Sequence, residues 1–169
     1  MIKKTLSGLF VASIIFASCV KSNNKCNYSD SNVTAPDSEV QNLKDSLFSH
    51  NITDATLNPI GFYYKIDSVK SGTSVTNLCS NISVSYKGTY FNGVSFDSTA
   101  ANQVATFQLG QVIVGWQKGI PLVSKGGVMT LYIPPTLAYG PNPVKDNAGN
   151  VLVPGNSYLV FKVRVLDIQ

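Results

Sequence analysis

The sequence is poor in charged residues and almost free of histidine. Only 13% of its 169 residues are Asp, Glu, Lys or Arg, and His50 is the one histidine. With a single histidine and no nucleophile elbow, a hydrolytic triad is excluded unless an unusual base takes part, and a metal site is disfavoured. The sequence also lacks a Gly-rich phosphate loop. We therefore expect neither a metal nor a cofactor.

The charges that are present do not gather at one place along the chain. The formal net charge is +4, and two of the positive charges, Lys3 and Lys4, belong to the N-terminal segment. Without a basic cluster, nucleic acid is not expected as a partner. Thirteen glycines and eight prolines favour short strands and tight turns over long surface helices.

The N-terminal apolar run is too short to span a bilayer as a helix. The two lysines precede an uncharged, mostly apolar stretch over 6–16, and FASC then ends at Cys19. This order of segments is typical of a secretory signal. FASC resembles a bacterial lipobox with phenylalanine where leucine is usual, which implies cleavage before Cys19 and lipidation of that cysteine. Lipid chains, at about 0.8 kcal/mol per buried methylene, would hold the protein on a membrane. The alternative is an ordinary signal peptide cut before the same residue.

Cysteine is scarce, and its count suggests a pairing. If Cys19 carries lipid, Cys26 and Cys79 remain as an even pair in an oxidising compartment. We predict a disulfide between them that joins the N-terminal segment to the folded domain. The alternative is two free or metal-binding thiols, and the wide spacing and the lack of histidine argue against the metal.

Four segments divide the chain. They are a signal peptide over 1–18, a lipid-attached flexible tether over 19–36, an N-terminal helix with its connector over 37–60, and one domain over 61–169. Asp37 is expected to cap the helix, which ends near Ser49 and carries an apolar stripe of Val40, Leu43 and Leu47.

The domain alternates strand-like and turn-like segments. Ile82, Val84 and Tyr86 alternate with polar residues, which is the period of a half-buried strand. One short helix is expected over 112–123, and 136–157 is expected to be a long loop. Strands are predicted over 61–69, 81–87, a short run ending at Phe96, 105–110, 128–134 and 157–168. One helix among several antiparallel strands is an α+β pattern.

Aromatic residues lie near the predicted turns, and one carboxylate lies among them. Asp97 is the only acidic residue between Ser68 and Lys145. It is either a structural hydrogen-bond acceptor or part of a pocket wall, and its spacing leaves both open. The aromatic residues near it are Tyr86, Phe96, Phe107, Trp116, Tyr139 and Phe161.

Four motifs together resemble the FKBP family in order and spacing. They are VSYKGTYFNGVSFDST (84–99), FQLGQVIVGWQKGIPLVSKGG (107–127), YIPPTLAYG (132–140) and LVFKVRVLDI (159–168). The resemblance covers roughly 61–169. It implies an enzymatic activity, peptidyl-prolyl cis-trans isomerisation. It implies an antiparallel, strongly curved sheet of five to six strands wrapped around one short helix, to which the N-terminal helix is an addition.

The same resemblance implies a role for several polar groups. The Tyr139 hydroxyl and the backbone N–H of Ile113 would bind carbonyl groups of the substrate. Asp97 would orient Tyr86 and contact the twisted amide. These four residues are the candidate catalytic set.

The resemblance also implies an apolar pocket for the proline ring. Trp116 would form its floor, although plain core packing is an alternative for Trp116 and Phe161. The walls would be Tyr86, Phe96, Val112, Ile113 and Phe161, with Val153 closing the pocket from the long loop.

The predicted function is an isomerase that accelerates X-Pro isomerisation in exported proteins. Its partners would be proline-containing polypeptide segments and, through the lipid anchor, a membrane, with the protein itself monomeric. Val20 offers no obvious signal for retention at an inner membrane, so we expect the periplasmic face of an outer membrane. The alternatives are a non-catalytic FKBP-like chaperone or partner-binding lipoprotein, and a structural envelope lipoprotein.

Overall fold

The computed structural model describes residues 26–75 and 77–169. The predicted signal peptide, the lipidation at Cys19 and the first part of the predicted tether lie outside these ranges. In the described part no helix is long and apolar enough to cross a membrane.

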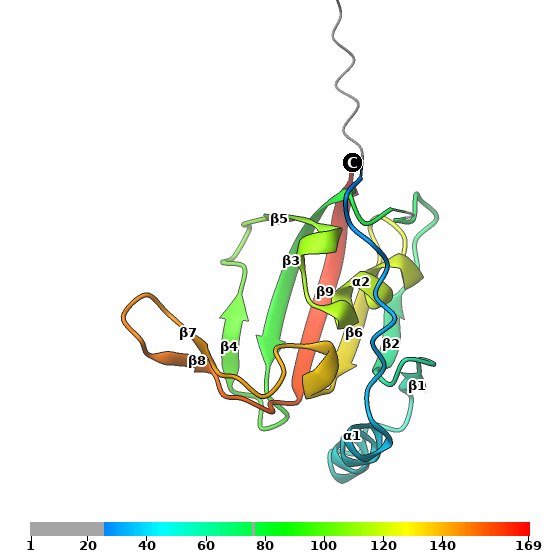
Figure 1. Ribbon diagram of the computed structural model, residues 1–169. Coiled ribbons are helices and arrows are strands. Elements are labelled where there is room, and N and C mark those ends of the chain that lie inside the picture. Colours follow the sequence, from blue (N-terminus) through cyan, green and yellow to red (C-terminus); the bar gives the residue numbers. More distant parts are fainter. Residues whose placement is uncertain (1–25, 76) are drawn as a thin grey trace, which may run out of the picture.

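A curved antiparallel sheet forms the body of the described chain (Figure 1). The strand order is β1-β2-β6-β9-β3-β4, and β5 also pairs with β3, so this sheet has seven strands in the part of the chain that the structure describes. The strands are β1 (Thr56–Leu57), β2 (Tyr63–Ser68), β3 (Asn81–Thr89), β4 (Ser95–Ser98), β5 (Ala105–Gln108), β6 (Val128–Ile133) and β9 (Leu159–Ile168). The α+β class is confirmed, and the two-residue β1 is the strand that the sequence did not predict.

The inner face of the sheet packs on a short helix, α2 (Val114–Gly119), which continues as a 3₁₀ turn over Ile120–Leu122. Alternation along β9 builds this face, because successive side chains of a strand point to opposite sides. Phe161 and Val163 are buried toward α2, whereas Lys162 is exposed on the other side. Two further 3₁₀ turns span Leu109–Gln111 and Pro135–Leu137.

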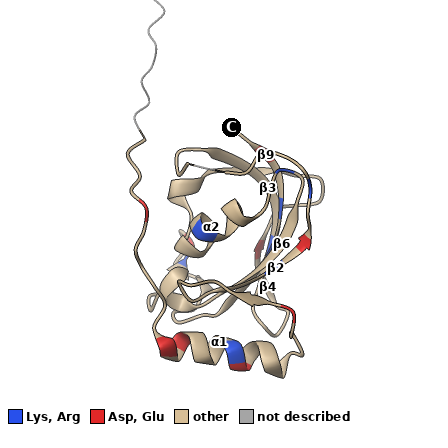
Figure 2. Cartoon of the chain, turned by 90° about the vertical axis from the view of Figure 1, so that its right-hand side faces the viewer, with Lys and Arg blue, Asp and Glu red and all other residues tan. Residues whose placement is uncertain are grey.

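The added N-terminal helix, α1 (Asp37–Ser49), packs across one end of the outer face (Figure 2). Leu43 and Leu47 are buried against Tyr132 of β6, as the predicted stripe requires. The predicted N-cap is wrong by one residue. Pro36 occupies the N-cap position in an extended conformation, and Asp37 is the first helical residue. The negative charge of Asp37 there interacts favourably with the positive end of the helix dipole.

The predicted loop over 136–157 contains a hairpin of β7 (Val144–Lys145) and β8 (Val151–Val153). The Asp146 carboxylate accepts hydrogen bonds from the backbone N–H groups of Ala148 and Asn150, at 2.9 Å each, and so organises the turn. The hairpin projects from the side of the domain (Figure 1).

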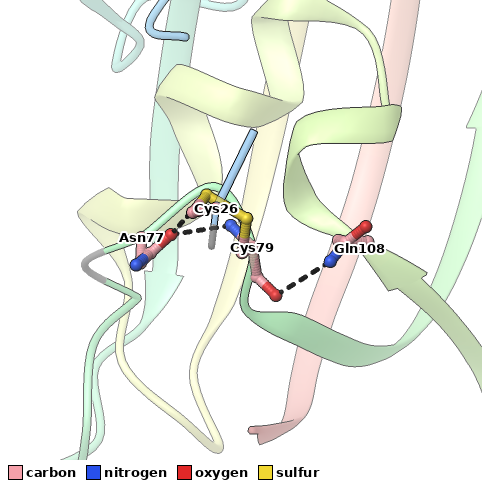
Figure 3. Close-up of a disulfide and its surroundings, with 4 residues drawn as sticks. All are labelled: Cys26, Asn77, Cys79 and Gln108. Atoms are coloured by element: carbon pink, nitrogen blue, oxygen red, sulfur yellow. Dashed lines mark hydrogen bonds between the residues drawn. A yellow bond between two sulfur atoms is a disulfide. The ribbon is translucent and has the colours of Figure 1, made fainter. Parts of the chain in front are cut away.

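A disulfide holds the start of the described chain on the domain. Cys26 and Cys79 are bonded, with their Cα atoms 5.6 Å apart (Figure 3), which is the pairing expected from the cysteine count. Asn77 Oδ1 accepts a hydrogen bond from the Cys79 N–H at 2.8 Å, and Gln108 donates to the Cys79 carbonyl at 3.2 Å. Cys79 is therefore fixed to β5 by a hydrogen bond and to the N-terminal segment by a covalent bond.

Residues 26–36, which we call the strap, lie against the domain and lead along α2 to α1 (Figure 1). Asp30 pairs with Lys118 of α2 at 2.6 Å. The ring of Tyr28 covers Gly110 so closely that a Cβ on that glycine would overlap it. The Ala35 N–H donates to the Ile60 carbonyl at 2.9 Å. The second half of the predicted tether is thus packed on the domain, which differs from the free tether expected over 19–36.

Candidate active site

A cavity of about 230 Å³ lies between α2 and the inner face of the sheet. Its aromatic lining is Tyr86, Phe107, Trp116, Tyr139 and Phe161. Its other lining residues are Asp97, Gln111, Val112 and Ile113. Seven of the nine residues predicted for the catalytic set and the pocket therefore meet at one place.

Trp116 is the centre of an aromatic cage. It projects from α2 and is 3% exposed. The rings of Tyr86, Phe107 and Phe161 stand edge-on to it, with centroids at 5.3, 6.0 and 5.3 Å and interplanar angles of 87°, 86° and 84°. Each such pair contributes about 0.5–1.5 kcal/mol beyond area burial. Trp116 and Phe161 are at once core residues and residues of the cavity lining.

The indole N–H of Trp116 has no acceptor among the described residues, although the nitrogen is buried. An unpaired buried donor costs about 1–3 kcal/mol. Because Trp116 lines the cavity, an acceptor on a bound group could remove that cost.

Asp97 and Tyr86 form the polar side of the cavity. The Tyr86 hydroxyl donates a hydrogen bond of 2.6 Å to Asp97 Oδ2. Pairing of β3 with β4 brings the two together, since Asp97 lies opposite Gly88, two residues beyond Tyr86. Both interpretations of Asp97 from its spacing therefore apply, because it accepts this hydrogen bond and lines the cavity.

Both tyrosines of the cavity are held in the neutral form. Burial, and then the hydrogen bond to Asp97, raise the pKa of Tyr86. Burial, and then the charge of Asp97, raise the pKa of Tyr139. The two phenols thus remain hydrogen-bond donors at neutral pH.

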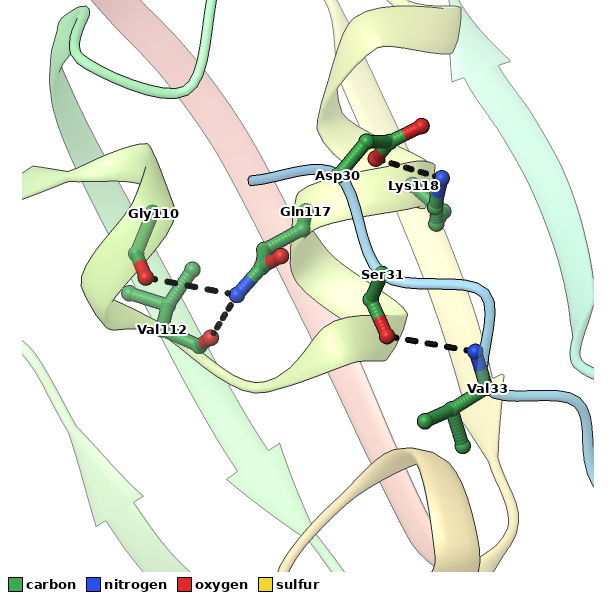
Figure 4. Close-up of polar contacts among 7 residues, drawn as sticks. All are labelled: Asp30, Ser31, Val33, Gly110, Val112, Gln117 and Lys118. Carbon is green, nitrogen blue, oxygen red and sulfur yellow. Dashed lines mark hydrogen bonds and ion pairs between the residues drawn. The ribbon is translucent and has the colours of Figure 1, made fainter. Parts of the chain in front are cut away.

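The turn before α2, which contains Val112 (Figure 4), also carries Ile113, a residue of the cavity lining. Gln117 of α2 donates through Nε2 to the Val112 carbonyl at 2.7 Å and to the Gly110 carbonyl at 3.4 Å. The Ile113 carbonyl accepts hydrogen bonds from α2, whereas its own N–H donates to no acceptor among the described residues. One backbone donor is therefore available at the cavity wall, on a turn whose geometry is fixed.

Two predicted wall residues, Phe96 and Val153, do not line the cavity. Phe96 lies over Gly88, where a Cβ would approach its ring to 2.7 Å, and stands edge-on to Phe161 at 5.4 Å. It supports a wall residue and is not one itself. Val153 is only 4% exposed, because the hairpin turns it into the core.

Phe107 and Gln111 take part in the lining instead. Phe107 is one of the aromatic residues near the predicted turns, but the motifs predict no role for it. The signal that could have placed it is alternation in β5, where Phe107 and Ala105 share one face and both pack on the core. Gln111 gave no such signal, since it lies in a 3₁₀ turn.

Helix α1 is tied to the turn that precedes Tyr139. Glu39 accepts two hydrogen bonds from Thr136, one from the backbone N–H at 2.9 Å and one from the hydroxyl at 2.8 Å. Both are charge-assisted and partly buried. Thr136 lies in the 3₁₀ turn that leads into Tyr139, so Glu39 positions that turn from outside the cavity.

Replacing Glu39 with alanine is expected to lower the free energy of unfolding by about 2 kcal/mol, because two charge-assisted hydrogen bonds are lost. Denaturant unfolding would measure it, with the exposed first-turn variant Asp37→Ala as control. Glu39→Gln, which keeps one acceptor oxygen, should fall between the wild type and Glu39→Ala. Equal stability of Glu39→Ala and wild type would contradict the role given to Glu39.

The described residues contain no group of three or more His, Cys, Asp or Glu side chains that could hold a metal ion. Any chemistry at this cavity that the side chains themselves supply would come from hydrogen-bond donors, one carboxylate and an apolar surface.

Comparison with known proteins identifies the family. Residues 72–166 match the FKBP-type peptidyl-prolyl cis-trans isomerase family. Because the match covers more than half of the chain, the protein belongs to this family, and the resemblance seen in the motifs is confirmed.

Two curated relatives and one solved structure illustrate the similarity. The isomerase FkpA of Buchnera aphidicola subsp. Schizaphis graminum is 38% identical over 110 residues, which cover 64% of this chain and 41% of the relative. The outer membrane protein MIP of Legionella longbeachae is 36% identical over 112 residues, which cover 66% and 46%. The crystal structure of FkpA from Escherichia coli has a TM-score of 0.61 and 29% identity, and covers 78% of this chain and 63% of that one. The chain thus spans less than half the length of the two curated relatives.

Proposed function

We propose that this protein is a peptidyl-prolyl cis-trans isomerase that binds the twisted X-Pro amide in the cavity at Trp116. The observation that carries the proposal is the Tyr86–Asp97 hydrogen bond at the polar side of an otherwise aromatic cavity. The motif-matched residues Ile113, Trp116 and Tyr139 lie in the same lining, and all of them fall within the family match over 72–166.

The barrier explains why such a cavity would suffice. Resonance makes rotation about a peptide bond cost about 18–20 kcal/mol. For a prolyl amide the cis and trans ground states differ by only about 0.5–1 kcal/mol, so the barrier is the obstacle. Turning the bond perpendicular to its plane removes the resonance and much of the charge separation of the amide. An apolar cavity therefore disfavours the planar, polar ground state more than the twisted state, and this difference in binding lowers the barrier.

Polar groups at the edge of the cavity would hold the two chain ends during the rotation. The Tyr139 hydroxyl and the Ile113 N–H are the proposed donors to carbonyl groups on either side of the proline. The Asp97 carboxylate would contact the twisted amide and keep Tyr86 in place. Fixing the geometry in this way lowers the entropic part of the barrier. No proton or electron pair has to be transferred.

We place this activity in the bacterial cell envelope, on exported proteins. The signal-like N-terminus and the lipobox-like FASC support export and an anchor at Cys19. A related protein is described as an outer membrane protein. We propose a lipid-anchored monomer at the periplasmic face of an outer membrane, which would speed folding steps that take tens of seconds uncatalysed.

A second candidate function is binding of unfolded chains with little turnover. The exposed apolar residues of the projecting hairpin favour it, since Val151 and Leu152 are 52% and 48% exposed. Such residues could contact apolar segments of a client beside the cavity.

The two functions differ in one measurement. The purified full chain is added to an Ala-X-Pro-Phe peptide, and the cis-to-trans relaxation is followed against buffer alone. A rate that rises in proportion to the protein concentration supports the isomerase. A rate equal to that in buffer, from protein with an intact disulfide, would refute the isomerase and favour the binding function.

A further inference from the structure

A second and larger hollow, of about 580 Å³, lies on the outer face of the sheet. Its floor is formed by β3, β9 and the start of β6, and residues 99–104 form its rim. We call this hollow the outer groove. The side chains of Lys87 and Lys162 lie on the opposite side of the sheet from the candidate active site, because they alternate with Tyr86 and Phe161. Tyr86 is the one residue that contributes to the lining of both hollows.

Basic side chains gather in the outer groove. Lys87 and Lys162 lie directly opposite each other in the pairing of β3 with β9, and Arg164 follows two residues later opposite Ser85. All three basic side chains are exposed. Figure 2 shows basic residues on α1 and α2, and it shows further basic residues on strands of the sheet. Like charges directly opposite each other in a sheet are destabilising, so the Lys87–Lys162 pair lowers the stability of the sheet.

None of the ion pairs among the described residues involves Lys87, Lys162 or Arg164. The ion pairs there use Lys65, Lys118 and Lys125, and the groove lining contains neither Asp nor Glu. Two acidic residues lie on or next to these strands and contact other residues, although Thr130, the partner of Asp67, lies opposite Lys162 in the pairing of β6 with β9. Asp167 pairs with Lys125, and Asp67 accepts a hydrogen bond from Thr130 at 2.7 Å.

The rest of the lining indicates what kind of anion would fit. Val128 and Leu166 provide apolar surface next to Arg164, and Asn102 and Gln103 provide amide groups at the rim. A hollow with both kinds of surface suits an extended chain that carries carboxylates and apolar side chains. Binding of nucleic acid depends mainly on Lys and Arg side chains that neutralise phosphates, and the outer groove offers only Lys87, Lys162 and Arg164 for this.

We infer that the outer groove is a docking site for acidic segments of a polypeptide partner, with Lys87, Lys162 and Arg164 as the groups that recognise the carboxylates. This inference goes beyond the proposed function, since it concerns the other face of the sheet and needs no turnover. It would allow the protein to hold a chain at one surface while a proline of that chain reaches the cavity.

Fluorescence anisotropy with a labelled, proline-free peptide of alternating Glu and Val tests the inference on the purified full chain. A peptide with Gln in place of Glu serves as the neutral probe. We expect the acidic peptide to bind and the neutral one to bind at least about tenfold more weakly, as one lost charge-assisted contact would produce. Binding should weaken as salt is raised, because exposed charges are screened.

Variants locate the binding on the surface. Lys87→Gln/Lys162→Gln, and separately Arg164→Gln, should each weaken binding of the acidic peptide about tenfold or more. The matched control Lys44→Gln/Lys70→Gln removes two exposed charges outside the groove and should leave binding within about twofold, since screening limits their reach. Circular dichroism and thermal unfolding establish that every variant is folded.

Several outcomes would overturn the inference. They are absence of acidic-peptide binding, equal binding of the neutral peptide, and equal losses in the groove and control variants. Binding of phosphatidylglycerol vesicles or of an oligonucleotide without binding of the peptide would assign the groove to a membrane or a nucleic acid instead. Protein that isomerises proline but ignores the acidic peptide would refute only this inference. Protein that binds the peptide but does not isomerise would refute only the proposed function.

Discussion

Replacing Asp97 with alanine is expected to lower kcat/KM for prolyl isomerisation about 10- to 100-fold, since a charge-assisted hydrogen bond contributes about 1.5–3 kcal/mol. The Asp97 carboxylate accepts the Tyr86 hydroxyl at 2.6 Å and lies in the cavity lining, so two contributions are lost together. One is the proposed contact with the twisted amide. The other is the anchor that keeps the Tyr86 ring edge-on to Trp116.

A double-mutant cycle separates these two contributions. Tyr86→Phe keeps the ring but removes the hydrogen bond, and it should cost less than Asp97→Ala. The double variant should be little slower than Asp97→Ala alone, because residues in direct contact act as a unit and their effects do not add. Strict additivity would mean that Asp97 acts without Tyr86.

The matched control is Asp37→Ala, which removes an exposed carboxylate from the first turn of α1. Its kcat/KM should stay within about twofold of wild type, since exposed charges outside the cavity are screened. The same cis-to-trans relaxation measures all variants, and unfolding curves verify that they are folded. Wild-type kcat/KM for Asp97→Ala would remove Asp97 from the proposed mechanism.

The sequence predicted the inner side of the domain well because its constraints are local or repeated. Alternation in 81–87 and 157–168 is enough to turn Tyr86 and Phe161 to the core face. The order of the four motifs then identifies Trp116 and Tyr139. The lining of one cavity by these residues follows from pairing of β3 with β9 and from the packing of α2 on the sheet.

The errors arise where the position depends on a neighbour distant in sequence. Phe96 was expected in the wall, but Gly88 has no side chain, so the ring settles over β3 and contacts Phe161 instead. Val153 was expected to close the pocket, but the β7–β8 pairing turns it into the core. No periodic pattern in the sequence predicts the position of either side chain.

The positions of the basic residues depend even more strongly on neighbours that are distant in sequence. No basic cluster exists along the chain, yet strand register brings Lys87 beside Lys162, 75 residues away in sequence. The absence of a basic cluster along the sequence therefore does not exclude a basic surface on the folded sheet. The strap is a similar case, because a polar segment without periodicity looks like a free linker until a disulfide fixes one end of it.

Removing the disulfide by Cys26→Ser/Cys79→Ser is expected to lower the free energy of unfolding by about 4 kcal/mol. The bond closes a loop with a sequence separation of 53. The entropy that such a closure removes from the unfolded chain corresponds to about 4 kcal/mol at 25 °C. Domains of this kind are stabilised by only about 5–15 kcal/mol in total, so the loss would be a large fraction.

The double variant should also loosen the strap from α2. With Cys26 released, Tyr28 and Asp30 are held only by noncovalent contacts with Gly110 and Lys118. Amide hydrogen exchange over 110–119 should accelerate, since local opening there no longer works against a covalent bond. The turn that presents Ile113 lies in this stretch, so the KM of a prolyl substrate is expected to rise with it.

The Asp30→Asn variant distinguishes the two expected effects of the disulfide. One is the restriction of the unfolded chain, and the other is the attachment of the strap to α2. The variant removes the ion pair with Lys118 but leaves the covalent loop, and an exposed pair of this kind contributes at most about 1 kcal/mol. If the disulfide acts mainly on the unfolded chain, Asp30→Asn keeps nearly full stability while the double cysteine variant loses most of the 4 kcal/mol expected. Equal stability of the oxidised wild type and the double cysteine variant would show that the strap is held by its packing alone.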